Sequence, residues 1–124
     1  KIFRTAAETT KKNAKIIVNF CVSYGGREEL AQAARRIAED VKNDPQAIAA
    51  INDETISRHL YTAGLPDVDL LIRTGGEKRL SGFMPWQSTY AELYFTDTLW
   101  PDFNEEELDR ALEDFSKRKR NFGQ

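Results

Sequence analysis

The residues best suited to chemistry lie in one short segment, residues 73–81, which reads RTGGEKRLS. It holds the guanidinium groups of Arg73 and Arg79, the amine of Lys78 and the hydroxyl of Ser81. Guanidinium groups bind phosphate oxygens through paired hydrogen bonds, and a serine hydroxyl adds a further donor. Because these four donors follow directly on an apolar run, they favour a phosphate-binding loop, with a solvated basic loop as the alternative.

A glycine pair, Gly75-Gly76, stands within this segment, and a second pair, Gly25-Gly26, follows another apolar run. Paired glycines let the backbone approach an anion closely and direct N–H groups toward it. A tight turn demanded by the chain connection is the alternative, and two glycines by themselves favour that turn. The sequence contains neither GxxxxGK(S/T) nor GxGxxG, so it does not support the usual nucleotide-binding loops.

Two carboxylates near this cationic segment, Glu77 and Glu92, are candidates for binding a metal ion. A diphosphate is usually bound together with Mg²⁺, which prefers oxygen ligands. A salt bridge to a neighbouring arginine is the favoured interpretation of Glu77. Glu92 stands immediately before the apolar run 93–95, an unusual place for a charge that only faces solvent. Asp67 and Asp69 flank a predicted strand, and we assign them to its entry turn.

The other reactive side chains indicate structural roles. His59 lies within a predicted helix, and Cys21 lies in an apolar run, where it is expected to be a small buried hydrophobe. No Ser/His/Asp or Cys/His arrangement suggests a nucleophile. With one histidine and one cysteine, the chain excludes a multi-histidine metal site and an internal disulfide, and the lone cysteine fits a reducing compartment.

The composition is that of an ordinary globular domain, with 124 residues of which 40% are hydrophobic and 31% are charged. Eighteen Lys and Arg against 20 Asp and Glu give a net charge of -2. This balance argues against broad nucleic-acid binding but permits a local anion site. No apolar run approaches the roughly 18 residues that a membrane span requires. We therefore expect one domain or part of one.

Strand and helix patterns alternate along the chain. Residues 15–23 form a nearly continuous apolar run rich in β-branched side chains, which predicts a strand buried on both faces. Apolar residues recur at helical spacing over 27–43 and predict a helix there. Asp53 is predicted to cap a shorter helix, which Gly64 and Pro66 bring to an end.

Four further segments are predicted: strands at 68–74 and 92–96, a helical turn at 86–90 and a final helix at 105–122. Asn104 and Glu107 resemble a capping box for the final helix. This order predicts an α/β fold with a mainly parallel sheet and helices on both faces. Three strands leave the edges of the sheet unpaired, and the chain does not start with methionine. We therefore expect a piece of a longer protein.

One long motif carries a resemblance to a known family. It starts with residues 65–77, LPDVDLLIRTGGE, and continues with Arg79, Ser81, Phe83, Trp86-Gln87, Tyr90, Glu92 and Phe95. Asn19 and YGGR at 24–27 fit the same pattern upstream, as does WPDF at 100–103 downstream. Together these residues resemble the C-terminal signature of the cis-prenyltransferase family, most closely its bacterial undecaprenyl diphosphate synthases. The resemblance covers essentially the whole chain, so residues 1–124 are expected to be the C-terminal part of a single domain.

The resemblance implies an enzyme that condenses isopentenyl diphosphate onto an allylic diphosphate such as farnesyl diphosphate, which gives a polyprenyl diphosphate lipid carrier for the cell wall. It also implies Mg²⁺ dependence, a homodimer and a hydrophobic tunnel. Arg73, Arg79 and Ser81 would hold isopentenyl diphosphate, with Leu80 in the same segment. Glu92 would be a Mg²⁺ ligand that reaches the site in the dimer. A cytoplasmic location with peripheral membrane contact through the lipid product is expected, without a nucleic-acid partner.

Some of the family's pattern has no counterpart here. The family's N-terminal half supplies an essential aspartate, which nothing in this chain matches, so we assign no catalytic residue. We expect residues 1–124 to provide only the isopentenyl diphosphate half-site and to be inactive alone. Ser23 stands where the family usually has asparagine, and Asn121 stands where it has arginine two residues before Gly123. Arg120 is expected to compensate in part for that arginine.

Two other functions stay open at this point. One is a non-catalytic subunit that stabilises a catalytic partner, which would tend to lose the phosphate-loop arginines that this chain keeps. The other is a plain anion-binding α/β module.

Overall fold

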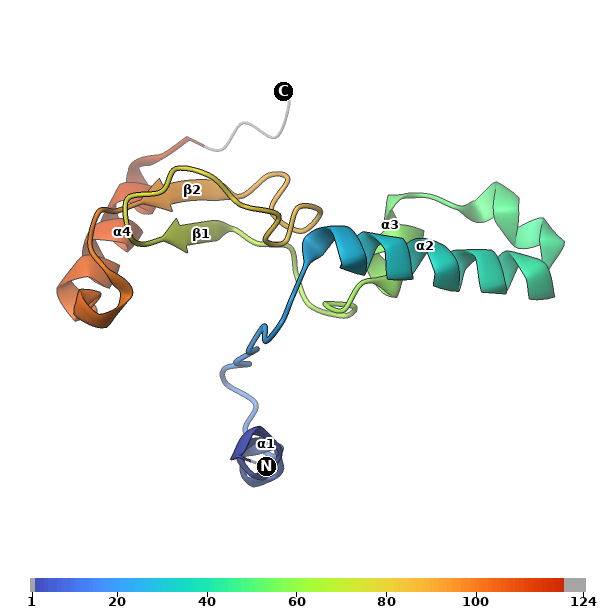
Figure 1. The fold of residues 1–124 in the computed structure, drawn as a ribbon, viewed down its shortest axis with the longest axis horizontal. Helices are drawn as coiled ribbons and strands as arrows, with labels where there is room; N and C mark the ends of the chain where they lie inside the picture. Colours follow the sequence, from blue (N-terminus) through green and yellow to red (C-terminus); the bar gives the residue numbers. More distant parts are fainter. Residues whose placement is uncertain (1, 120–124) are drawn as a thin grey trace.

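The sheet that carries the candidate loop consists of two strands in the computed structural model, which describes residues 2–119. β1 (Leu70–Arg73) and β2 (Glu92–Phe95) pair in parallel, with Leu70 opposite Glu92 and Arg73 opposite Phe95. Leu71 of β1 is buried. The predicted parallel α/β arrangement is confirmed, and both strands lie inside the ranges that the apolar runs predict (Figure 1).

The strand predicted at residues 15–23 is wrong. This segment follows α1 (Ile2–Thr10) as extended chain without strand pairing, and its apolar side chains are exposed, with 77% of Ile16 and 67% of Val22 accessible. A strand needs backbone partners on a neighbouring strand, and within residues 2–119 only β1 and β2 pair. Cys21, expected to be buried, is exposed for the same reason.

Three helical elements pack together at one end of the molecule, beyond the first residues of the strands (Figure 1). They are α2 (Gly26–Asn43), the 3₁₀ helix η1 (Pro45–Ala50) and α3 (Asp53–His59). Ala33 of α2 and Leu60, directly after α3, are buried. The cap of α3 is Asn52 rather than the predicted Asp53. The Asn52 side chain accepts a hydrogen bond from the Thr55 N–H at 2.9 Å, and Thr55 Oγ1 accepts one from the Asn52 N–H at 3.3 Å.

The last helix, α4 (Glu105–Lys117), packs against β2, and its Ala111 is fully buried. It is preceded by the 3₁₀ helix η2 (Trp100–Asp102). The predicted cap is present, because the Asn104 side chain accepts a hydrogen bond from the Glu107 N–H at 3.1 Å. The predicted end of this helix near residue 122 is wrong, because α4 ends at Lys117 and the backbone of its C-cap Arg118 is extended.

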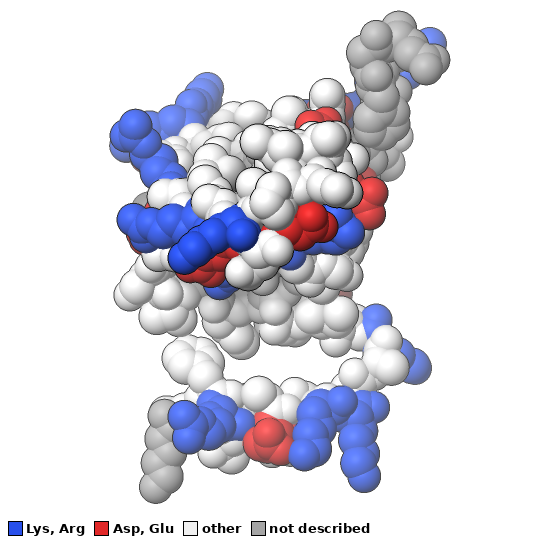
Figure 2. Space-filling view, turned by 90° about the vertical axis from the view of Figure 1, so that its right-hand side faces the viewer, with Lys and Arg blue, Asp and Glu red and all other residues white. Residues whose placement is uncertain are grey.

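Neither sign of charge dominates the main body on the face that Figure 2 shows. Figure 2 shows basic and acidic side chains interleaved on the face turned to the viewer. No helix within residues 2–119 is both long enough and apolar enough to cross a membrane.

Candidate phosphate-binding loop and candidate metal ligand

Arg73, the last residue of β1, organises the candidate phosphate loop. Its Nη1 donates to the hydroxyl of Ser81 at 3.1 Å and to the backbone carbonyl of Arg79. Within residues 2–119, its Nε and Nη2 groups make no hydrogen bond, so they keep donors for a ligand. The structure therefore brings Arg73 and Ser81 together, as the sequence predicts. Leu80, which stands between Arg79 and Ser81 in the chain, is half-buried.

The side chain of Arg79 is exposed beside that of Glu77. The two form an ion pair, with 62% of the Arg79 side chain and 48% of the Glu77 side chain accessible. The favoured interpretation of Glu77 as an arginine partner is thus confirmed. Ion pairs this exposed contribute at most about 1 kcal/mol, so an anionic ligand can displace Glu77 at little cost.

The glycine pair in this loop bends the chain after β1 against the segment that follows β2. Gly75 and Gly76 have φ angles of 86° and 79°, in the left-handed region that glycine adopts without a steric penalty. Their N–H groups donate to the carbonyls of Thr98 and Thr96, both at 2.9 Å. These two N–H groups are bonded to the segment that follows β2, so the glycine pair does not direct them toward an anion.

The second glycine pair joins α2 to the far end of the same loop. The Gly26 N–H donates to the carbonyl of Gly82 at 3.0 Å. A Cβ atom at Gly26 would lie 2.2 Å from Cδ of Pro85, whereas one at Gly25 would meet nothing closer than 3.9 Å. Gly26 therefore permits a close approach that fixes the backbone directly after Ser81 against the helix.

A buried carboxylate that the sequence analysis missed supports this junction. Glu29 of α2 is only 1% exposed. It accepts hydrogen bonds from the Tyr24 hydroxyl, the Tyr61 N–H at 2.8 Å and the Gln87 amide nitrogen at 3.1 Å. Burial and the hydrogen bond to Glu29 raise the pKa of the Tyr24 hydroxyl above its ordinary value. One sequence signal for this burial was available. Glu29 stands four positions before Ala33, which belongs to the apolar face of the predicted helix, so the two residues share that face.

Glu92 and Arg73 stand at different ends of the paired strands. Glu92 is the first residue of β2 and pairs with Leu70. Arg73 pairs with Phe95, which stands three positions after Glu92. At about 3.3 Å per residue, this separation is roughly 10 Å along the strand. The backbones of Arg73 and Glu92 therefore stand at opposite ends of the two paired strands within one chain.

The Glu92 carboxylate is held by an arginine that the sequence analysis did not single out. Arg118 Nη1 donates to Oε2 of Glu92 at 2.9 Å, and 26% of the Glu92 side chain is accessible. Within residues 2–119, Oε1 of Glu92 accepts no hydrogen bond, and no group of three or more His, Cys, Asp or Glu could hold a metal ion. One carboxylate with a free oxygen fits Mg²⁺ bound jointly by protein and diphosphate, since such ions take one or two carboxylates plus phosphate oxygens.

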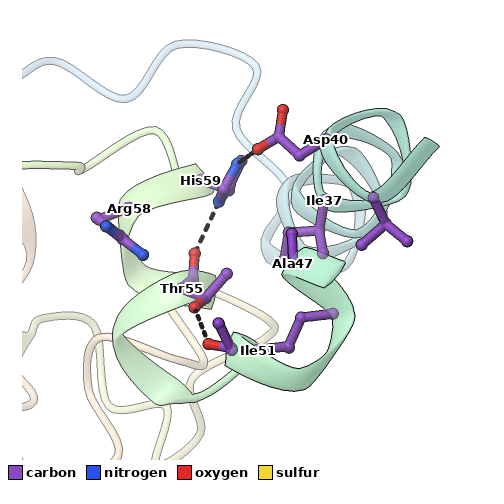
Figure 3. Close-up of a pocket in the computed structure, with 9 residues that line it drawn as sticks. Ile37, Asp40, Ala47, Ile51, Thr55, Arg58 and His59 are labelled. Atoms are coloured by element: carbon purple, nitrogen blue, oxygen red, sulfur yellow. Dashed lines mark hydrogen bonds and ion pairs between the residues drawn. The ribbon is translucent and has the colours of Figure 1, made fainter. Parts of the chain in front are cut away.

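His59 has the structural role that the sequence predicts. It lines a cavity of about 380 Å³ between α2, η1 and α3 (Figure 3). Its Nδ1 lies 2.7 Å from the Thr55 carbonyl, and its Nε2 lies 2.8 Å from Oδ2 of Asp40. Both ring nitrogens are therefore engaged, and the contact with Asp40 connects α3 to α2.

The predicted contributions of Arg120, Asn121 and Gly123 lie outside the described residues and stay predictions.

Comparison with known proteins places these features in a family. Residues 1–123 match the prenyltransferase family model described as "Putative undecaprenyl diphosphate synthase". The chain belongs to this family.

The chain is 48% identical over 120 residues to the ditrans,polycis-undecaprenyl-diphosphate synthase, (2E,6E)-farnesyl-diphosphate specific, of Haemophilus influenzae, with 97% of this chain and 50% of that protein covered. It is 46% identical over 123 residues to isoprenyl transferase 1 of Streptomyces coelicolor, with 99% and 44% covered. The chain thus spans about half the length of these curated relatives.

Solved structures agree with this assignment. A structure titled as a "probable undecaprenyl diphosphate synthase" from Campylobacter jejuni aligns with a TM-score of 0.79 at 38% identity, over 98% of this chain and 54% of that one. Lavandulyl diphosphate synthase from Lavandula x intermedia, solved with dimethylallyl diphosphate, also aligns with a TM-score of 0.79, at 45% identity over 83% of this chain and 44% of that one.

Proposed function

We propose that the protein carrying this chain condenses isopentenyl diphosphate onto an allylic diphosphate, such as farnesyl diphosphate, to make a polyprenyl diphosphate. Residues 1–124 supply the isopentenyl diphosphate half-site. The observation that supports this most directly is the loop in which Arg73 is bonded to Ser81 while two of its nitrogens stay free of other described residues. Membership of the prenyltransferase family supplies the reaction class.

In this proposal the loop residues bind and orient the substrate. The guanidinium groups of Arg73 and Arg79 and the hydroxyl of Ser81 donate to the diphosphate oxygens, and Leu80 lies in the same segment. Holding the diphosphate fixes the homoallylic double bond relative to the allylic carbon that it attacks. We assign no general base to this chain for the proton that is lost after the new bond forms.

Glu92 is the residue proposed to hold Mg²⁺. When bound, the ion neutralises charge on a diphosphate group, which favours its departure from the allylic carbon. Because Glu92 and Arg73 lie at opposite ends of one sheet, the proposal places Glu92 at the loop of the second subunit of a homodimer. The protein is proposed to be cytoplasmic, with peripheral membrane contact through its lipid product.

Turnover of labelled isopentenyl diphosphate with farnesyl diphosphate and Mg²⁺ tests this function. The full-length protein is expected to form extended polyprenyl diphosphate, while residues 1–124 alone form none. Binding of isopentenyl diphosphate without turnover by the full-length protein would indicate a non-catalytic subunit. Equal affinity for isopentenyl diphosphate and inorganic phosphate would indicate a general anion-binding module.

A further inference from the structure

Arg118 joins the candidate metal ligand to the end of the last helix. Its Nη1 donates to Oε2 of Glu92 at 2.9 Å and to the carbonyl of Leu93 at 3.0 Å, and its Nε donates to Oδ2 of Asp114 at 2.8 Å. We propose that Arg118 is a positioning residue that orients Glu92 for metal binding. The inference rests on the proposed function, because it presumes that Glu92 binds the metal.

The geometry leaves Glu92 one oxygen to offer. The contact with Arg118 engages Oε2, whereas Oε1 accepts no hydrogen bond within residues 2–119. A carboxylate that coordinates a metal is commonly fixed by a hydrogen bond to a second protein group. Two hydrogen bonds, to Asp114 and to the Leu93 carbonyl, hold the guanidinium in place, and the guanidinium in turn restricts the rotation of the Glu92 carboxylate.

The charges of this cluster suit a cation. A lone arginine beside a metal ligand would repel the metal ion, but Asp114 lies 2.5 Å from Nη2 of Arg118 and offsets that charge. One cation and two carboxylates leave the cluster with a net negative charge. Arginine is effectively always charged, so this balance does not depend on its titration.

The position of Arg118 at the end of α4 explains why it can reach the sheet. It is the first residue after the helix, and its N–H still donates to the Phe115 carbonyl at 3.1 Å. Arg110 on the same helix provides a matched comparison. It pairs with Glu106 and Glu107, and 60% of its side chain is accessible.

The test measures metal binding without turnover. Mn²⁺, a paramagnetic substitute for Mg²⁺, is titrated into the full-length protein with isopentenyl diphosphate present and no allylic substrate, and free Mn²⁺ is read by electron paramagnetic resonance. Arg118→Met is expected to weaken Mn²⁺ binding about ten- to hundred-fold, the usual effect of removing a group that holds a metal ligand. Arg110→Met is expected to bind as wild type does.

A double variant separates orientation from general stability. If Arg118 acts through Glu92, Glu92→Gln with Arg118→Met binds Mn²⁺ no more weakly than Glu92→Gln alone. Arg118→Lys keeps the charge but not the forked geometry, so an intermediate loss is expected, and this variant serves if Arg118→Met does not fold.

Unchanged Mn²⁺ affinity in Arg118→Met, even with a lower melting temperature, would overturn the inference and leave the function intact. So would a further loss in the double variant. Wild-type affinity in Glu92→Gln would instead overturn the proposed role of Glu92, and the role of Arg118 with it.

Discussion

Arg73 shows how a single side chain divides its donors between structure and ligand. One nitrogen, Nη1, holds the segment that follows β1 by bonding to Ser81 and to the Arg79 carbonyl. The remaining nitrogens are directed to no other described residue. A guanidinium is suited to both tasks because it carries five donors in a rigid plane.

Glu29 is the residue whose loss should destabilise the protein most clearly. Glu29→Ala removes the acceptor of two part-buried donors, the Tyr24 hydroxyl and the Tyr61 N–H, and one of the two acceptors of the buried Gln87 amide, which keeps its bond to Thr62. A buried donor left unpaired costs about 1–3 kcal/mol and a part-buried one less, so we expect a melting temperature lower by several degrees. Glu28→Ala is the control, because the Glu28 side chain is 64% exposed. Equal melting temperatures for the two variants would refute the structural role of Glu29.

Tyr24 should make the protein sensitive to alkali. Burial and the hydrogen bond to Glu29 raise the pKa of its hydroxyl in the folded protein, while in the unfolded chain the pKa stays near 10.0. Above that pH the unfolded state loses the proton that the folded state keeps, so the free energy of unfolding falls as pH rises.

Denaturant titrations of wild type and Tyr24→Phe between pH 8 and about 11 measure this effect. Tyr24→Phe is expected to lose less stability than wild type over that range. Tyr90→Phe, at a residue that is 70% exposed, should behave as wild type does. Parallel curves for wild type and Tyr24→Phe would contradict the prediction.

Among the structural elements, the helices and their caps are predicted well from the sequence, because they depend on residues that are close together in the chain. The 3.6-residue spacing places α2 within one residue of its start, because helical hydrogen bonds join residues four positions apart. The cap of α3 was predicted as Asp53 but is Asn52. Both residue types can cap a helix, and the reciprocal hydrogen bonds between Asn52 and Thr55 decide between them.

Features that depend on distant partners were less predictable. Residues 15–23 have the composition of a buried strand, but a strand exists only where another strand supplies hydrogen bonds. Arg73 and Ser81 were predicted to share one short binding segment, and their hydrogen bond agrees with that prediction. The separation of Glu92 from Arg73 follows from the strand register, which no local pattern shows. Helical spacing hints that Glu29 faces inward, but its partner Gln87 lies 58 positions away and could not be identified from that spacing.

Gly26 gives a prediction about the junction between α2 and the candidate loop. Gly26→Ala places a methyl group 2.2 Å from Cδ of Pro85 and 2.3 Å from the Gly82 carbonyl oxygen, so helix and loop must separate. We expect lower stability and weaker binding of isopentenyl diphosphate, because Ser81 immediately precedes Gly82. Gly25→Ala is the matched control, with φ at -139° and its closest contact at 3.9 Å. Equal affinities in calorimetric titrations of both variants would contradict this link.

For the whole molecule, the central question is whether one site draws residues from two subunits. Arg73 and Glu92 lie at opposite ends of the sheet in a single chain. A symmetric dimer can bring the Glu92 of one subunit to the Arg73 loop of the other. The assignment of both residues to one reaction thus depends on assembly.

Mixing two impaired variants tests that assembly. Arg73→Ala and Glu92→Gln are each expected to be nearly inactive. If Glu92 serves the loop of the other subunit, a mixed dimer contains one intact site, and random exchange restores about a quarter of wild-type activity. If both residues serve the same subunit, unfolding and refolding the mixture restores none. Refolding each variant alone controls for recovery by refolding itself.

Equilibrium binding of isopentenyl diphosphate to the Arg73 variant tests the central claim most directly. Isothermal titration of the full-length protein compares wild type, Arg73→Ala and the exposed control Arg110→Ala. Loss of a charge-assisted hydrogen bond costs roughly 1.5–3 kcal/mol, so Arg73→Ala should bind about ten- to hundred-fold more weakly, and Arg110→Ala as wild type does. Wild-type affinity in Arg73→Ala would contradict the assignment of residues 73–81 as the isopentenyl diphosphate site.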